Sequence, residues 1–191
     1  MKIILTLLKT KKTVFGFSDL ENIFSNTSYD VLITTLLRYR KSGELLNPQK
    51  GIWTLPIFNE KELACKIYSW GYISLETVLY EEWIIFQWYG DSTRVVRNNT
   101  REKIFEDHKY ISRKIKDSIF KNNMYVREKN NYLIATPERA LCDLCYLQKK
   151  LQIDNIDYFN NDQSKFRFKD LFPIYPKYVE ENVRSAFKRE I

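Results

Sequence analysis

Cysteine, glycine and proline are scarce in this chain, and histidine occurs once. The 191 residues include three Cys, five Gly, five Pro and one His. An odd, small number of cysteines argues against a disulfide-stapled secreted scaffold. So few glycines and prolines leave no long flexible linker. The single His108 has no nucleophile motif around it and is expected to be a surface turn residue.

Long apolar runs are also missing. None approaches the roughly 20 residues that a membrane-spanning helix needs. The start, residues 1–8, superficially resembles a signal peptide, but Lys9, Lys11 and Lys12 follow in place of a cleavage site. A first amphipathic helix explains this start better. We therefore expect a cytoplasmic protein with no membrane partner.

Basic residues, in contrast, are in excess and unevenly distributed. The formal net charge is +7. Residues 1–56 carry eight Lys/Arg against four Asp/Glu, residues 57–93 two against six, and residues 94–132 eleven against five. Because cations near phosphates release counterions on binding, the two basic blocks predict two faces for a nucleic acid. A soluble basic protein without such a partner would have the same balance.

The first 56 residues are predicted to fold as three helices followed by a β-hairpin. Apolar residues recur at helical spacing within residues 3–8. The pattern Ser18-Asp19-Leu20-Glu21 is that of a capping box, which predicts a short helix through Phe24. A third helix is expected from Tyr29 to Lys41, where Ser42-Gly43 follows and supplies a left-handed C-cap.

The third helix has two distinct faces. The inward stripe is Leu32, Leu36 and Tyr39. The outward stripe is Asp30, Thr34, Leu37, Arg38 and Lys41. Residues 44–46 and 52–55 are expected to be strands, joined by a turn over residues 47–51 and ended by Pro56.

This order of elements is typical of a winged helix-turn-helix, whose third helix enters the DNA major groove. We expect Arg38 to donate two hydrogen bonds to a guanine, Thr34 to contact a thymine methyl group and Lys41 to bind a phosphate. Lys50 lies at the tip of the wing. The complete set of DNA contacts predicted for this domain is Ser28, Tyr29, Thr34, Arg38, Lys41 and Lys50. A core helix with a solvated charged face, or a protein-interaction module, is the alternative.

Residues 57–191 are expected to form a second domain, mixed α/β with a small antiparallel sheet, so that the fold class is α+β. We predict a helix over residues 59–69, a helix capped by Ser74 and a buried apolar run at residues 83–89. Two or three antiparallel strands should follow between residues 93 and 120, with another at residues 131–135. A second nucleic-acid surface is predicted on their basic face, at Arg94, Arg97 and Lys114. A solvated sheet face is the alternative.

The segment Thr136-Pro137-Glu138 predicts the start of another helix, with Thr as N-cap and Pro in its first turn. Arg139 and Asp143 are expected to pair four residues apart in a structural role, and a polar functional site is the alternative. Cys142 and Cys145 lie inside this helix, where buried packing is a better explanation than redox or zinc chemistry. Two C-terminal helices should be separated near residues 173–176.

Four segments resemble the AbiEi-type antitoxins. Residues 71–80, Gly-Tyr-Ile-Ser-Leu-Glu-Thr-Val-Leu-Tyr, are similar to the start of that family's second domain. Residues 132–144, with the run Pro-Glu-Arg-Ala-Leu leading to Asp-Leu, resemble its strand-then-helix motif. Residues 37–45 and 51–53 look like its recognition helix and wing. The resemblance covers roughly residues 1–150, and residues 151–191 lie outside it.

The resemblance implies an antitoxin of a type IV toxin–antitoxin pair that represses its own operon by binding inverted repeats in operator DNA, as a monomer that binds cooperatively. The neighbouring gene would encode a nucleotidyltransferase toxin with which it forms no stable complex. No cofactor, metal or catalytic residue is expected.

Three other functions stay open. The first is a stand-alone regulator without a toxin. The second is a nuclease or nucleotidyltransferase, since Asp91, Glu102 and Glu106 imitate a carboxylate cluster. The third is a protein-interaction adaptor.

Overall fold

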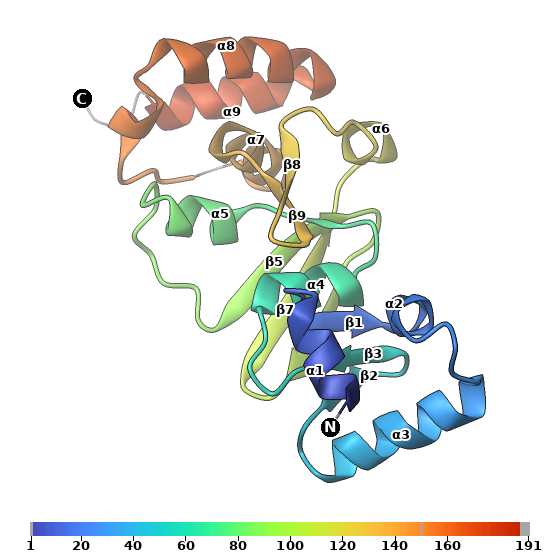
Figure 1. Cartoon of the computed structure of the whole chain (residues 1–191). Coiled ribbons are helices and arrows are strands. Elements are labelled where there is room, and N and C mark those ends of the chain that lie inside the picture. Colours follow the sequence, from blue (N-terminus) through green and yellow to red (C-terminus); the bar gives the residue numbers. More distant parts are fainter. Residues whose placement is uncertain (1, 150, 188–191) are drawn as a thin grey trace. The chain divides into compact units, whose positions relative to one another are not determined.

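The computed structural model describes residues 2–149 and 151–187 and has a mixed α+β fold. The chain divides into two compact units, Met1–Ser69 and Trp70–Ile191 (Figure 1). This boundary lies later than the one predicted between residues 56 and 57. The difference comes from one helix, α4 (Glu60–Ile67), which belongs to the first unit.

Long-range polar contacts hold α4 in the first unit. The buried carboxylate of Glu62 accepts hydrogen bonds from Thr13, at 3.0 Å from the backbone N and 2.6 Å from the hydroxyl Oγ1. The ammonium of Lys66 lies 2.6 Å from the carboxylate of Asp19. These partners are far apart in sequence, so no local pattern could have indicated that the domain continues beyond Pro56.

The first unit contains helices packed on a small sheet. Besides α4, its elements are α1 (Lys2–Lys9), β1 (Val14–Gly16), α2 (Phe17–Ile23), α3 (Tyr29–Lys41), β2 (Leu46–Gln49) and β3 (Ile52–Thr54). The three strands are antiparallel in the order β1-β3-β2. Their core is the cluster Leu7, Phe15, Leu20, Leu32, Leu36, Tyr39, Leu45, Trp53 and Leu55.

Two local predictions in this unit are wrong in detail. The predicted capping box from Ser18 does not form, because α2 begins at Phe17 and its N-cap is Gly16, where the carboxylate of Asp19 accepts from the backbone N at 2.7 Å. The first hairpin strand is Leu46–Gln49, so the turn shrinks to Lys50-Gly51. Pro48 fits inside this strand because β2 is at the edge of the sheet, where a missing N–H leaves no partner unpaired.

The second unit is built on one six-stranded sheet. The strands are β4 (Tyr72–Ile73), β5 (Ser92–Arg97), β6 (Arg101–Phe105), β7 (His108–Lys114), β8 (Val126–Lys129) and β9 (Tyr132–Ala135). Their order is β6-β7-β5-β4-β9-β8. The prediction of an antiparallel sheet is wrong. The sheet is mixed, because β5 pairs with β7 and β4 pairs with β9 in parallel.

The helices of the second unit are α5 (Glu76–Glu81), α6 (Asp117–Phe120), α7 (Pro137–Leu147), α8 (Asp162–Leu171) and α9 (Lys177–Phe187), with short 3-10 turns η1 (Ile156–Phe159) and η2 (Phe172–Ile174). Helices α5, α8 and α9 pack against α7, and Figure 1 draws α8 and α9 close to it. The predicted pair of C-terminal helices separated near residues 173–176 is confirmed.

The apolar run at residues 83–89 is not buried as predicted. Only Ile84 and Ile85 are covered, whereas Trp83 is 69%, Phe86 58% and Trp88 60% exposed. The run belongs to no helix or strand beyond the turn that ends α5, so neither periodicity nor a sheet turns its aromatic side chains inward. Its backbone is held instead by Asp154, whose carboxylate accepts from Phe86 N at 2.6 Å.

Ser74 is not the N-cap of the next helix either. That position is Leu75, which has the positive φ of 61° that non-glycine residues rarely adopt. The hydroxyl of Ser74 is committed to a residue of α7 instead, as described below. Across the described ranges, no helix has the length and apolar character needed to span a membrane.

Candidate nucleic-acid interface

Helix α3 forms where the sequence predicts it, and for the predicted reasons. Its bounds are Tyr29–Lys41, and its buried residues are Leu32, Leu36 and Tyr39. Ser28 caps the N-terminus through its backbone, with its carbonyl accepting from Leu32 N at 2.9 Å. At the other end Gly43 has a φ of +76°, the left-handed conformation that glycine adopts without steric penalty.

The opposite face of α3 is open to solvent within the described structure. Thr34, Arg38 and Lys41 are all exposed, as predicted. Two apolar side chains lie on the same side, with Val31 57% and Leu37 49% exposed. This helix therefore presents a face that is neither core nor uniformly polar.

Phe17 contacts both parts of the predicted DNA-binding surface, the N-terminus of α3 and the turn between β2 and β3. Its ring meets the ring of Tyr29, at the start of α3, edge-on with centroids 5.2 Å apart. Its backbone N donates to the carbonyl of Gly51, in the turn between β2 and β3, at 2.8 Å. The N-terminus of α3 and the turn that carries Lys50 are thus both fixed against the first residue of α2.

The cations of this surface are available to a ligand. No carboxylate among the residues described pairs with Arg38, Lys41 or Lys50, and all three side chains are exposed. Arg38 lies over the ring of Tyr39 with its guanidinium carbon 5.7 Å from the centroid. The last turn of α3 also contains Arg40, so positive charge concentrates at its C-terminal end, where the helix dipole favours it.

Arg94 does not belong to an open basic surface. Its side chain is 14% exposed, and its Nε lies 3.3 Å from the carboxylate of Glu76, which is 6% exposed. The same guanidinium donates to Ser92 Oγ at 3.0 Å and stacks on the ring of Tyr89 at 4.9 Å. These contacts use Arg94 inside the second unit, which weakens its assignment as a DNA contact.

Arg97 and Lys114 do lie together. They face each other as register partners on the parallel strands β5 and β7. Lys114 is exposed and Arg97 half-buried. Because side chains alternate along a strand, Arg94 and Arg97 point to opposite faces of the sheet. The predicted second surface therefore reduces to the pair of Arg97 and Lys114.

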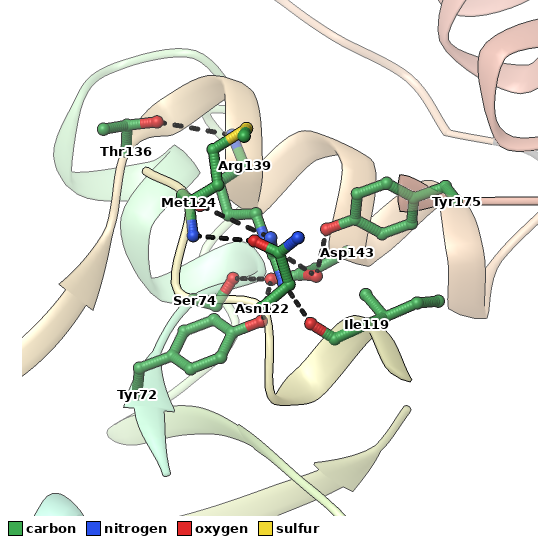
Figure 2. A network of polar contacts seen from close by, with 9 residues as sticks. All are labelled: Tyr72, Ser74, Ile119, Asn122, Met124, Thr136, Arg139, Asp143 and Tyr175. Carbon is green, nitrogen blue, oxygen red and sulfur yellow. Dashed lines mark hydrogen bonds and ion pairs between the residues drawn. The ribbon is translucent and has the colours of Figure 1, made fainter. Parts of the chain in front are cut away.

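A buried polar network occupies the middle of the second unit (Figure 2). The carboxylate of Asp143, on α7, accepts hydrogen bonds from three hydroxyls: Ser74 at 2.8 Å, Tyr72 at 3.0 Å and Tyr175 at 2.6 Å. Arg139 Nε lies 3.4 Å from the same carboxylate, and neither side chain is exposed. The predicted pairing of Arg139 with Asp143 is confirmed, whereas the three hydroxyl partners were not foreseen.

Arg139 also binds the chain around α6. Its Nη2 donates to the hydroxyl of Tyr72 at 3.0 Å and to the carbonyl of Ile119 at 2.9 Å. Its Nη1 lies 3.4 Å from the carbonyl of Met124. The Thr136 N-cap predicted for α7 is confirmed, since its hydroxyl accepts from Arg139 N at 3.5 Å.

Ionisation in this network follows from its burial. Burial raises the pKa of Tyr72 and of Tyr175 well above the ordinary value, so both stay protonated and donate. Burial also raises the pKa of Asp143, against the opposing effects of Arg139 and the hydroxyl donors. Burial lowers the pKa of Arg139, but the charge of Asp143 and the hydrogen bond with Tyr72 raise it more, so Arg139 stays charged.

Other predicted polar residues also have internal partners. Glu138 is 1% exposed and accepts from Ser164 Oγ at 2.7 Å and from Arg167 at 3.2 Å, both on α8. The ring of His108 lies in β7, not in a turn, with Nε2 2.9 Å from the hydroxyl of Thr93. Within the described parts of the chain, no three His, Cys, Asp or Glu residues cluster as metal ligands would.

No protein-family model and no curated protein matches this chain. The assignment of the candidate interface therefore depends on its geometry and on the sequence resemblance stated above.

Proposed function

We propose that the chain is a sequence-specific DNA-binding repressor whose first unit is a winged helix-turn-helix. The order α1-β1-α2-α3-β2-β3 and the antiparallel β1-β3-β2 sheet support this assignment. In such a fold α3 is the recognition helix and the β2–β3 turn is the wing.

The observation that carries the proposal is the exposed face of α3, where Arg38 and Lys41 pair with no carboxylate of the described residues, together with the exposed Lys50 in the β2–β3 turn. Arg38 reads a guanine edge with its forked guanidinium, and Thr34 contacts a thymine methyl. Lys41 and Lys50 bind phosphates. Ser28 and Tyr29 meet the backbone at the helix N-terminus, which Phe17 holds in place.

We further propose that this repressor is the antitoxin of a type IV toxin–antitoxin pair. The support is the resemblance of residues 71–80 and 132–144 to AbiEi-type antitoxins, and these segments supply Tyr72, Ser74, Arg139 and Asp143 to the buried network. Its partners are then inverted repeats in operator DNA, bound cooperatively by monomers, and a nucleotidyltransferase toxin that it opposes without a stable complex. In this function it needs no cofactor and acts as a binding protein rather than an enzyme.

Binding to the DNA upstream of its own gene tests the repressor function. Labelled duplexes of this region and of scrambled sequence are titrated, and anisotropy is followed over a range of salt concentrations. We expect Arg38→Ala to weaken binding by about 1–3 kcal/mol and to relax the preference for one base pair. Arg40→Ala is the matched control, because it removes the same charge from a different side of α3. Equal affinity of Arg38→Ala and the unsubstituted protein would contradict the recognition assignment.

Co-expression tests the antitoxin function separately. A nucleotidyltransferase encoded beside this gene is expected to arrest growth alone and to lose that effect when this protein is present. The two proteins should not co-purify. Operator binding without rescue of growth would leave a stand-alone regulator as the function.

The exposed Val31 and Leu37 favour a second candidate, a protein-docking role for the same face. In a recognition helix such side chains contact thymine methyl groups instead. Double substitution of both residues by Ser separates the two. A docking surface would lose its protein partner while DNA affinity and its salt dependence stayed unchanged.

A further inference from the structure

A pocket of 740 Å³ opens in the C-terminal part of the second unit, where α8, η2 and α9 meet. This volume lies within the range of about 300–1,000 Å³ that is typical of small-molecule sites. All the side chains that line it belong to residues 165–187, the region outside the resemblance to antitoxins. The proposed DNA-binding function makes no use of it.

The interior of the pocket is apolar and aromatic. Val183 and Phe168 form its covered part, with residue exposures of 0% and 6%. Phe172 stacks on Phe168 at a centroid distance of 5.7 Å, and Phe187 meets it edge-on at 5.8 Å. Such a lining favours the burial of a hydrocarbon or aromatic group.

The polar side chains around this interior are mostly cationic. Lys165, Lys169, Lys177 and Arg184 line the pocket, against one carboxylate, that of Glu180. Glu180 forms an ion pair with Arg184, whose Nη2 lies 2.7 Å from Oε1 of Glu180. Lys165 pairs with Asp162, with Nζ 3.5 Å from Oδ1. Lys169 and Lys177 make no ion pair with any residue that the structure describes, and both are exposed.

We propose that this pocket binds a small amphipathic acid, with an apolar body over the phenylalanines and one carboxylate between Lys169 and Lys177. Lys177 is the first residue of α9, so the positive end of that helix adds to the attraction for the carboxylate. An apolar body without a charge would leave both ammonium groups unpaired, and a cation would be repelled by them.

The pocket is also connected to the buried network. Tyr175 lines the pocket, and its hydroxyl donates to Asp143 at 2.6 Å. A ligand that packs on Tyr175 binds only the folded second unit, because the pocket does not exist in the unfolded chain. Its binding therefore stabilises that unit. Ligand binding is therefore measurable as a rise in the stability of the full chain.

A series of ligands that differ only in the head group tests the proposal. Decanoate, decanol and decylammonium are titrated into the full chain by calorimetry. We expect decanoate to bind about tenfold or more tightly than decanol, since a hydrogen bond to a charged group contributes more than one to a neutral group. Decylammonium should bind most weakly. Equal binding of all three, or no binding of decanoate, would overturn the proposal.

Charge-removing variants locate the carboxylate. The double variant Lys169→Ala/Lys177→Ala should bind decanoate about tenfold more weakly and decanol unchanged. Lys121→Ala, which removes an exposed lysine directly after α6, is the control and should bind decanoate normally. Because these lysines are exposed, the variants should fold. Undiminished decanoate binding by the double variant would contradict the assignment, and none of these outcomes depends on operator binding.

Discussion

Tyr175 donates a 2.6 Å hydrogen bond to the buried carboxylate of Asp143, from a position 32 residues further along the chain. The bond joins the segment after η2 to the middle of α7. Tyr72 and Ser74, about 70 residues before Asp143, reach the same carboxylate from β4 and the residue that follows it. One acidic side chain thus connects the first strand of the second unit, its central helix and its C-terminal part.

Asp143→Ala should strongly destabilise the second unit. It removes the acceptor of three hydroxyls and leaves the buried Arg139 without its counter-charge, a loss of about 3–5 kcal/mol. Asp117→Ala is the matched control, because Asp117 also pairs with a cation four residues away but is 59% exposed. Urea denaturation followed by circular dichroism measures both. Similar small effects of the two substitutions would show that the network contributes little.

Asp19 should make the first unit sensitive to acid. Burial raises the pKa of this carboxyl, but Lys66, the backbone N of Gly16 and Lys12 lower it more, so its pKa lies below the usual value. The stabilisation is therefore complete above the unfolded pKa of about 4 and is lost as the pH falls through the folded value.

The substitution Asp19→Asn tests whether the pKa of Asp19 is lowered in the folded protein. At neutral pH it should lower the free energy of unfolding by about 1–2 kcal/mol, because charged hydrogen bonds are lost. The difference from the unsubstituted protein should shrink as the pH falls below about 4. Glu21→Gln, an exposed change on the same helix, should show neither effect. A difference that grows toward acid would mean that the pKa of Asp19 is shifted upward.

Lys50→Ala should weaken operator binding without changing which sequence is preferred. A phosphate contact at the tip of the β2–β3 turn contributes equally to all duplexes, and its loss reduces the slope of log affinity against log salt by about 1. Lys149→Ala, in the second unit, is the control. Anisotropy titrations on several operator variants measure the effect. A loss confined to one variant would indicate that Lys50 contacts a base.

The three cysteines should differ in reactivity. Burial raises the pKa of Cys142 well above its ordinary value and that of Cys145 to about 12, whereas Cys65 is only half-buried. Since the thiolate is the reactive form, a thiol reagent at about pH 8 should label Cys65 first. Labelling of all three should require denaturant. Mass spectrometry of the modified protein distinguishes these states. Rapid native labelling of Cys142 would show that α7 opens.

Local patterns were sufficient to predict the helix that carries the candidate interface. The bounds of α3, its buried stripe and its glycine stop are confirmed because each depends on residues within about four positions of one another. The same holds for the Thr136 cap and the Arg139–Asp143 pair. The exposure of Thr34, Arg38 and Lys41 follows from the same helical periodicity.

Contacts between distant segments could not be read in this way. The inward hydroxyls of Tyr72 and Tyr175 look like ordinary surface or core tyrosines in the sequence, and only the fold brings them to Asp143. The parallel pairing of β5 with β7 depends on the path of the chain through β6. The pairing of Arg94 with Glu76 is likewise not local, so the sequence could not show that this arginine already has a partner inside the protein.

The sequence alone thus determined which face of α3 is exposed, its charge and its ends, because helix periodicity and capping act over a single turn. Tertiary structure decided which cations remained unpaired, where the first unit ended and which side chains hydrogen-bond to Asp143. These depend on side chains that meet only after the chain has folded, when most buried polar groups find a hydrogen-bond partner.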